Sequence, residues 1–291
     1  MFNSVLKKDG VNGTVAVGCG GAGCNIVNRL GTLSDVDMLT VNTDRKGLVR
    51  SRSNLRILLG SGSNSGGDVD IGTELARASS DRIEKGIAGY RNVIVMAGLG
   101  GGTGTGSAKI VSEIAKRNGS RVIAILSIPM SFESGRREVA MDSLPEIAEH
   151  SDILVVLDGD RLAKIDPMIG AREAFSVLDQ MVCESFAAMV RMLDNDHDGS
   201  VFKAMEGFVT VSFADGMDAD KVADRLIRGL MMDADIRSEQ VLFVRGNIPN
   251  GTISETISKS TGMTPMFVQG PEGRGMNIIM FSPIICPCSS L

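Results

Sequence analysis

Two glycine-rich segments carry the residues best suited to hold an anion. The first is GCGGAGCN at residues 18–25, and the second is GLGGGTGTGS at residues 98–107. Each follows a short apolar run and precedes a helical pattern, which places both at the carboxyl ends of predicted strands. Backbone N–H groups without side chains approach a phosphate closely, and Thr103, Thr105 and Ser107 add hydroxyl donors. The pattern predicts phosphate binding, and glycines used only for tight turns are the simpler alternative.

The residues of the two loops limit which class of phosphate-binding protein the chain can be. Neither loop ends in Gly-Lys-Ser/Thr, which the Walker pattern requires. Residues 18–23 satisfy GxGxxG, and Asp44 follows the next predicted strand as a ribose-binding acid would in a dinucleotide fold. A dinucleotide needs only one such fingerprint, so the longer loop would have no role. A dinucleotide-dependent oxidoreductase therefore stays as a minor alternative.

Alternating apolar runs and amphipathic stretches predict the elements that position these loops. From residue 14 to about 165 the order of elements indicates α/β architecture with a doubly wound, mostly parallel sheet. Pro145 is expected to kink or interrupt a helix over residues 137–150. Residues 171–193 predict a long helix that is apolar around most of its circumference and therefore buried between layers. Beyond it, further strands and helices predict a smaller α/β domain.

Composition excludes several classes of protein. The 291 residues include 30 basic and 35 acidic side chains, a net charge of −5, and 43% hydrophobic residues. Because no basic block occurs, a nucleic-acid partner is not expected. No apolar run reaches about 18 residues and the start lacks a signal-peptide core, so direct membrane insertion is not expected either. The five cysteines lack zinc-ligand spacing, which favours reduced thiols in a cytoplasmic protein.

Several motifs together resemble those of the tubulin and FtsZ family of GTP-binding, filament-forming proteins. GGGTGTG at residues 100–106 looks like the signature of that family. Other pieces follow in the family's order: GGAGCNIVNRL at 20–30, VNTD at 41–44, GSGSN at 60–64, FESGRR at 132–137, DRL at 160–162 and AFSVLD at 174–179. The resemblance is close from about residue 15 to 193 and looser beyond. It is closer to the prokaryotic cell-division FtsZ branch, archaeal members included, than to eukaryotic tubulins.

The resemblance implies an organisation and an activity. It implies a GTP-binding domain at 1–170, a central connecting helix at 171–193 and a C-terminal activation or assembly domain at 194–291. It also implies GTP or GDP as ligand together with Mg²⁺, and GTP hydrolysis at the subunit interface of a cytoplasmic, head-to-tail filament. The partner would be another copy of the chain or another FtsZ, in cell division or a related scaffold role.

The same resemblance assigns the residues that would hold the nucleotide. The phosphate loops are Gly20, Gly21, Ala22, Gly100, Gly101, Gly102, Thr103, Gly104, Thr105 and Gly106. The loops near the phosphates and magnesium contribute Asn42, Thr43, Asp44, Gly62 and Asn64. The guanine and sugar side consists of Asn25, Glu133, Arg137, Phe175 and Asp179.

Within that last group each side chain has an implied role and a simpler alternative. Glu133 and Arg137 match positions that hold the ribose, and Asn25 faces base and sugar. Phe175 would stack on guanine, while Asp179 would accept hydrogen bonds from its N1 and N2 groups. Without the resemblance, Phe175 is by default a core residue of its helix, and Glu133 with Arg137 is a weak ion pair at a helix entry.

The chain departs from the family at single positions and at its end. Gly159 stands where the family has Asn before DRL, which leaves base selectivity less certain, and Lys109 stands where a proline commonly follows the signature. The sequence ends soon after its last predicted strand, whereas the family usually continues through a linker to a docking peptide. Direct recruitment of this chain to a division ring is therefore in doubt.

The larger departure is the loop after the central helix. The family has a pattern resembling N-x-D-x-x-D there, and this chain places His197 and Ser200 at the two aspartate positions. Asp194, Asp196 and Asp198 lie within one turn and are the candidate catalytic carboxylates, with Asp196 and Asp198 ranked first.

Three alternatives to a normal catalytic loop remain open. Hydrolysis is expected to be weak, or absent in a nucleotide-binding regulator of a true FtsZ. The acidic residues also begin a calcium-loop pattern, although its twelfth position is Met205 instead of an acid. A solvated acidic loop is the plainest interpretation.

Overall fold

The sheet of the molecule carries both glycine loops at one edge. The computed structural model describes residues 13–31, 36–61, 65–246, 250–271 and 276–286. Within these residues, ten strands form one sheet in the order β3-β2-β1-β4-β5-β6-β7-β10-β8-β9. The strands are β1 Thr14–Cys19, β2 Asp37–Asn42, β3 Leu55–Leu58, β4 Asn92–Gly98, β5 Arg121–Ile128, β6 Ile153–Asp158, β7 Gly207–Gly216, β8 Val241–Arg245, β9 Met266–Gln269 and β10 Met276–Pro283. Neighbours from β3 to β7 are parallel, and β10 is antiparallel to β7 and β8, so the predicted mostly parallel sheet is confirmed.

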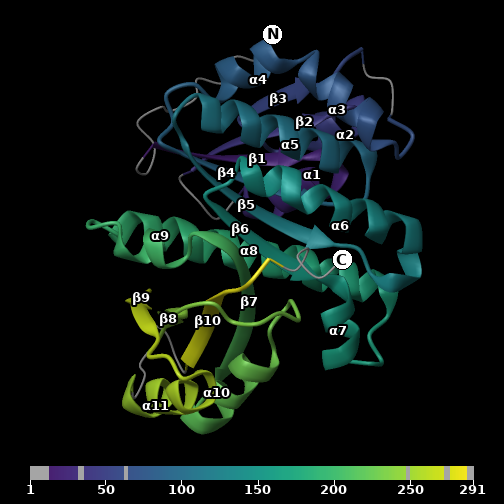
Figure 1. Ribbon diagram of the computed structural model, residues 1–291. Helices are drawn as coiled ribbons and strands as arrows, with labels where there is room; N and C mark the ends of the chain where they lie inside the picture. Colours follow the sequence, from purple (N-terminus) through teal and green to yellow (C-terminus); the bar gives the residue numbers. More distant parts are fainter. Residues whose placement is uncertain (1–12, 32–35, 62–64, 247–249, 272–275, 287–291) are drawn as a thin grey trace.

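Helices cover both faces of the parallel part (Figure 1). They are α1 Gly20–Leu30, α2 Arg45–Arg50, α3 Val69–Arg77, α4 Ser80–Ile87, α5 Gly102–Arg117, α6 Ser134–Glu149, α7 Gly159–Ile165, α8 Ala171–Asn195, α9 Ser200–Ala204, α10 Ala219–Arg228 and α11 Asn250–Thr261, with a short 3-10 turn at Ser131–Glu133. Side chains alternate along β1: Ala16 belongs to the core under α1 and α8, while Val15 and Val17 belong to the core under α5 and α6. The strands are therefore buried on both faces, as a doubly wound sheet requires.

Helix α8 crosses the middle of the molecule between the part that carries the loops and the C-terminal part (Figure 1). It runs from Ala171 to Asn195, two residues beyond its predicted end. Leu178, Val182 and Phe186 of its apolar stripe are buried as expected, whereas the side chain of Phe175 is 43% exposed. The first turns of α8 are thus open to a ligand while the middle of the helix is core.

The C-terminal part combines a core of its own with a shared one. Leu226, Ile253 and Ile278 belong to a cluster confined to this part. Phe243 and Phe281 belong instead to the cluster that contains α8. Since β7 also pairs with β6, the sheet is continuous through both parts. The domain limits at residues 170 and 194 stay a prediction.

Pro145 does not interrupt its helix. Helix α6 runs from Ser134 to Glu149 with Pro145 inside. The neighbouring Leu144 and Ile147 are fully buried. We attribute the tolerance to this packing, which offsets the hydrogen bond that proline cannot donate.

Candidate functional site

The two glycine loops touch each other where β1 and β4 end. These strands pair in parallel, with Cys19 opposite Ala97. Gly20 has φ +69°, and a Cβ added to it would lie 2.7 Å from Cα of Gly104. Only glycine accepts both that backbone conformation and that approach. The expected convergence of the loops on one crevice is confirmed.

Both helices that follow the loops begin without a side-chain cap. Helix α1 has Cys19 at its N-cap position and α5 has Gly101, and neither residue's side chain caps the helix. The first backbone N–H groups of a helix have no partner within it, and the helix dipole is positive there. Two such ends meeting at one sheet edge form an anion-binding site.

The loops enclose a hollow of about 310 Å³. Its lining consists of Gly21, Ala22, Asn42, Thr43, Asp44, Ser65, Gly67, Gly98, Gly101, Gly102, Thr103, Gly104 and Arg136. Oγ1 of Thr103 lies 2.8 Å from Oγ1 of Thr43 and 3.0 Å from Oγ of Ser65, so three hydroxyls from separate loops meet. Small size and hydroxyl donors suit a phosphate group.

Some predicted loop residues shape the hollow without lining it. Oγ1 of Thr105 is fully buried and accepts a hydrogen bond from the Gly100 amide at 3.0 Å, so its hydroxyl holds the loop. Gly100 has φ +81° and packs against the backbone of Arg136, while Gly106 packs against the backbone of Thr73 on α3. The absence of a side chain at these two glycines lets the neighbouring backbone segments pack closely against the loop. Gly62 and Asn64 lie outside the described residues.

A second hollow of about 320 Å³ adjoins the first and shares Ala22, Gly98 and Arg136 with it. Its full lining is Ala22, Asn25, Gly98, Leu99, Ser127, Ile128, Pro129, Glu133, Arg136, Phe175, Leu178 and Asp179. Phe175 meets Phe132 edge to face, with ring centroids 6.4 Å apart. Because Phe175 is partly exposed in this hollow, the alternative of a core residue is wrong. The two hollows form one cleft, which we call the nucleotide cleft.

The second hollow contains an unsatisfied carboxylate oxygen. Oε2 of Glu133 accepts from Nη1 of Arg136 at 2.6 Å. Oε1 of Glu133 is buried and has no hydrogen-bond partner among the described residues. An orphaned buried acceptor is costly, and a ligand hydroxyl would satisfy it.

The structure gives Arg136 the place in the cleft that the resemblance gave to Arg137. Arg137 binds both carboxylate oxygens of Asp158, at 2.6 and 2.9 Å, and the carbonyl of Pro129. It is absent from the lining of both hollows, whereas Arg136 lines both. The ribose role of Arg137 therefore has no support from its position. Arg136, Ser65 and Gly67 are lining residues that sequence reasoning missed.

Asp179 is a half-buried acid that lines the second hollow. Burial raises the pKa of Asp179, and the charge of Arg29, whose Nε lies 3.9 Å from Oδ2, opposes that rise. The departure at Gly159 is structural: a Cβ there would lie 2.8 Å from Cγ of Met130. An asparagine at this position would not fit without displacing that neighbour.

Lys109 is directed away from the phosphate hollow. Its Nζ lies 2.7 Å from Oε2 of Glu146, so it joins α5 to α6. The side chain is only 15% exposed.

The three aspartates at the end of α8 and just beyond it lie far from the nucleotide cleft of their own chain. Phe175 and Asp196 are 21 positions apart along α8 and its C-cap, which corresponds to about 30 Å. Oδ1 and Oδ2 of Asp196 accept from the amides of Val201 and Phe202, at 3.0 and 2.9 Å, so both oxygens bind the first turn of α9. These aspartates reach a γ-phosphate only if it belongs to another molecule.

Asp198 is the exposed carboxylate of this loop. The side chain of Ser200 lowers the pKa of Asp198, and so does the Ser200 amide, which donates at 3.0 Å. Asp194 is half-buried at the end of α8. Among the described residues, no three His, Cys, Asp or Glu side chains are grouped to hold a metal ion. The calcium-loop alternative therefore has no support.

Two further expectations concern the state of the cysteine thiols and insertion into a membrane. Burial raises the pKa of Cys19 and of Cys183 to about 12, so both thiols are protonated and unreactive at neutral pH. Cys288 lies outside the described residues. In the parts of the chain that the structure describes, no helix has the length and apolar character to cross a membrane.

The fold and the cleft define a doubly wound α/β protein of the nucleotide-binding class. The model of the GTPase domain of the Tubulin/FtsZ family matches residues 14–167. Cell division protein FtsZ 1 of Methanocaldococcus jannaschii is 31% identical over 264 residues, 88% of this chain and 69% of that protein. Cell division protein FtsZ 2 of Halobacterium salinarum is 38% identical over 177 residues, 59% of this chain and 45% of that protein. Some of these relatives are thus matched over only about half their length.

Solved structures agree with these sequence matches. An FtsZ dimer of M. jannaschii has a TM-score of 0.83 at 26% identity and covers 92% of this chain and 87% of that one. CetZ2 of Haloferax volcanii, in a GTPγS-bound protofilament, has a TM-score of 0.80, covers 94% and 93% of the two chains, and at 18% identity shows the fold alone. The chain belongs to the Tubulin/FtsZ family and carries its GTPase domain, and the oxidoreductase alternative gains no support.

Proposed function

We propose that this protein binds GTP in the nucleotide cleft and assembles head to tail, with hydrolysis at each interface. The observation that carries the proposal is the backbone contact of Gly20 with Gly104, which brings two helix N-termini to one anion site. Family membership supports guanine as the base. The same membership supports a cytoplasmic role in cell division or a related scaffold.

Different residues of the cleft would bind the phosphates, the sugar and the base. The amides of the two loops and the Thr103 hydroxyl would bind the phosphates. Glu133, through its free oxygen, and Asn25 would bind the sugar. Phe175 would stack on the base, and Asp179 would accept from guanine N1 and N2.

Asp44 fits the magnesium that such a triphosphate carries. Its carboxylate lines the phosphate hollow while also accepting from the amides of Lys46 and Gly47 at 2.9 and 3.0 Å. Magnesium is held in proteins by one or two carboxylates with phosphate oxygens and water, so no larger acidic cluster is needed. When bound, the ion would neutralise charge on the phosphates.

The attacking water requires a second molecule. Asp198 is the best-placed acid because it is exposed, whereas Asp196 is half-buried against the first turn of α9. In a head-to-tail contact Asp198 of one copy would orient water toward the γ-phosphate of the next. Such a heterologous contact does not close on itself and builds a filament.

Sedimentation measured together with phosphate release tests this function. The wild-type protein is expected to pellet with GTP and to release phosphate only under pelleting conditions. Asp198→Ala should pellet with GTP but release phosphate about a hundredfold more slowly. Absence of GTP-dependent pelleting across salt and pH would reject assembly, and unchanged release in Asp198→Ala would reject the role of that residue.

A second candidate is a nucleotide-binding regulator that co-assembles with another FtsZ and hydrolyses little. The observation in its favour is the commitment of Asp196 to the α9 amides, with His197 and Ser200 at the family's aspartate positions. This function predicts GTP binding, negligible phosphate release alone, and a change in the assembly of a hydrolysing FtsZ. Vigorous release by the chain alone would reject it.

A further inference from the structure

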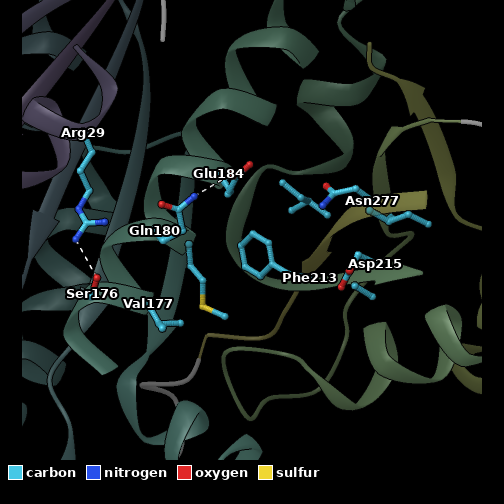
Figure 2. A pocket seen from close by; sticks show the side chains of 12 residues that line it. Arg29, Ser176, Val177, Gln180, Glu184, Phe213, Asp215 and Asn277 are labelled. Carbon is cyan, nitrogen blue, oxygen red and sulfur yellow. Dashed lines mark hydrogen bonds between the residues drawn. The ribbon is translucent and has the colours of Figure 1, made fainter. Parts of the chain in front are cut away.

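Arg29 connects α1 to the first turns of α8 beside the nucleotide cleft. Figure 2 shows its side chain extended toward Ser176, and Nη2 donates to Oγ of Ser176 at 3.0 Å. Nε lies 3.9 Å from Oδ2 of Asp179. Asp179 lines the cleft, whereas Arg29 lines a separate hollow between α8 and the C-terminal strands. The guanidinium therefore approaches the acid from behind, outside the space a nucleotide would occupy.

The separation of Arg29 and Asp179 matters for what the acid can bind. At 3.9 Å the pair attracts by charge, but the distance is too long for a hydrogen bond. Arg29 therefore leaves the carboxylate lone pairs available while favouring the ionised form. The bond to Ser176 fixes the guanidinium in this position.

Other charged groups near Asp179 are already paired. Glu133 and Arg136, which line the same hollow from the turn before α6 and from α6, bind each other at 2.6 Å. Glu184, one turn further along α8, binds Arg245 of β8 at 3.0 Å.

The remaining titratable neighbour is a thiol. Cys183 is buried on α8, and burial raises its pKa to about 12, so it is neutral at physiological pH. Among the described residues, Arg29 is therefore the cation that acts on Asp179.

The protonation state of Asp179 decides which base edge it matches. An ionised carboxylate offers two acceptor oxygens to guanine N1–H and N2–H. A protonated carboxyl has one acceptor and one donor, and its donor opposes the guanine amino group. Burial raises the pKa of Asp179, whereas Arg29 lowers it, so removing Arg29 moves protonation toward neutral pH.

We propose that Arg29 is a positioning residue for base selection, which holds Asp179 ionised and aimed so that the site prefers guanine. This inference rests on the proposed function, because it requires guanine to lie against Asp179. Guanine selectivity is then set by a pair of residues from two helices, one of which does not touch the nucleotide.

Inosine triphosphate provides the matched probe. It keeps the ring N1–H, the ribose and the triphosphate of GTP, but lacks the amino group at C2. The ratio of GTP to ITP affinity therefore cancels effects of pH on the phosphates and reports on Asp179. Binding is measured by calorimetry from pH 5 to 8 on wild type, Asp179→Ala, Arg29→Gln and Arg29→Lys. Arg52→Gln, at an exposed arginine, serves as a charge control.

The expected result is a shift along the pH axis. In wild type the preference for GTP over ITP, about tenfold or more for a hydrogen bond to a charged group, should persist to acidic pH. In Arg29→Gln it should be lost at a higher pH than in wild type. Arg29→Lys should restore most of the wild-type profile, and Arg52→Gln should match wild type.

Three outcomes separate the inference from the function on which it rests. If Arg29→Gln loses affinity for GTP and ITP equally at every pH, Arg29 is only structural and the inference fails. If Asp179→Ala leaves the GTP to ITP ratio unchanged, the base does not lie against Asp179 and the proposed base site fails. A normal ratio in wild type with loss in Asp179→Ala and an unshifted profile in Arg29→Gln would overturn the inference alone.

Discussion

Gly20 and Gly104 are in backbone contact, and this contact joins the two glycine loops into one anion site. A Cβ on Gly20 would lie 2.7 Å from Cα of Gly104, and Gly20 has φ +69°. The close approach leaves no room for a side chain, so the glycines are required by packing as well as by conformation.

Gly20→Ala should therefore abolish nucleotide binding and lower the free energy of unfolding by more than the conformational penalty alone. Gly119→Ala is the matched control, because Gly119 has φ +78° but no atom within 4 Å of an added Cβ. The control should lose about 1–2 kcal/mol and keep its nucleotide. Urea denaturation and GTP titration measure the two effects, and equal losses in both variants would contradict the packing argument.

Replacing Asp179 by asparagine should change the base that is preferred. The amide keeps one acceptor for N1–H and places an N–H₂ donor where guanine also has a donor. Xanthine has a carbonyl there, so Asp179→Asn should bind GTP at least tenfold more weakly and XTP more tightly. Glu184→Gln, one turn along α8 and outside the cleft, should bind both nucleotides as wild type does. Retained GTP preference in Asp179→Asn would argue against this acid as the base reader.

Adjacent arginines should give opposite phenotypes. Arg136→Ala removes a cation from the cleft, and nucleotide affinity should fall about tenfold while the free energy of unfolding changes by less than about 1 kcal/mol. Arg137→Ala leaves the carboxylate of Asp158, which is 9% exposed, without its bidentate partner. That variant should lose about 2–3 kcal/mol of stability. If Arg137→Ala lowers affinity without lowering stability, the resemblance assigned the ribose contact correctly.

The acidic loop should divide into a structural and a functional carboxylate. Asp196→Ala removes the acceptor for the first amides of α9 and should lower the free energy of unfolding by about 1 kcal/mol. Asp198→Ala should slow phosphate release without changing GTP affinity. The neighbouring Ser200 lowers the pKa of Asp198, so its carboxylate stays ionised at acidic pH. Phosphate release should consequently not decline through this group between pH 8 and 6, and a midpoint near pH 6 that Asp198→Ala removes would contradict the prediction.

The arrangement of strands and loops was predictable because it depends on local patterns. Apolar runs bounded by glycine give strands, and in a parallel sheet their carboxyl ends share one edge, so two glycine loops after β1 and β4 had to lie near each other. The convergence of Gly20 with Gly104 follows from that rule.

Side-chain direction was not predictable in the same way. Arg136 and Arg137 are adjacent on α6, about 100° apart around the helix, and only the position of Asp158 on β6 decides which one faces the cleft. Phe175 fits an apolar stripe, yet the first turns of α8 extend beyond the core that buries Phe186. Both outcomes depend on tertiary packing that a single sequence does not encode locally.

The length of helix α8 has a consequence for any filament built from these molecules. This single helix of 25 residues carries Asp179, the proposed base-binding acid, in its third turn and is followed directly by the acidic loop. In a head-to-tail assembly, the length of α8, about 37 Å, would set the distance between successive nucleotides. If one helical turn were added within α8, the acidic loop of that chain would no longer lie where an unaltered neighbour requires it. Mixed polymers of the two lengths would therefore stop growing.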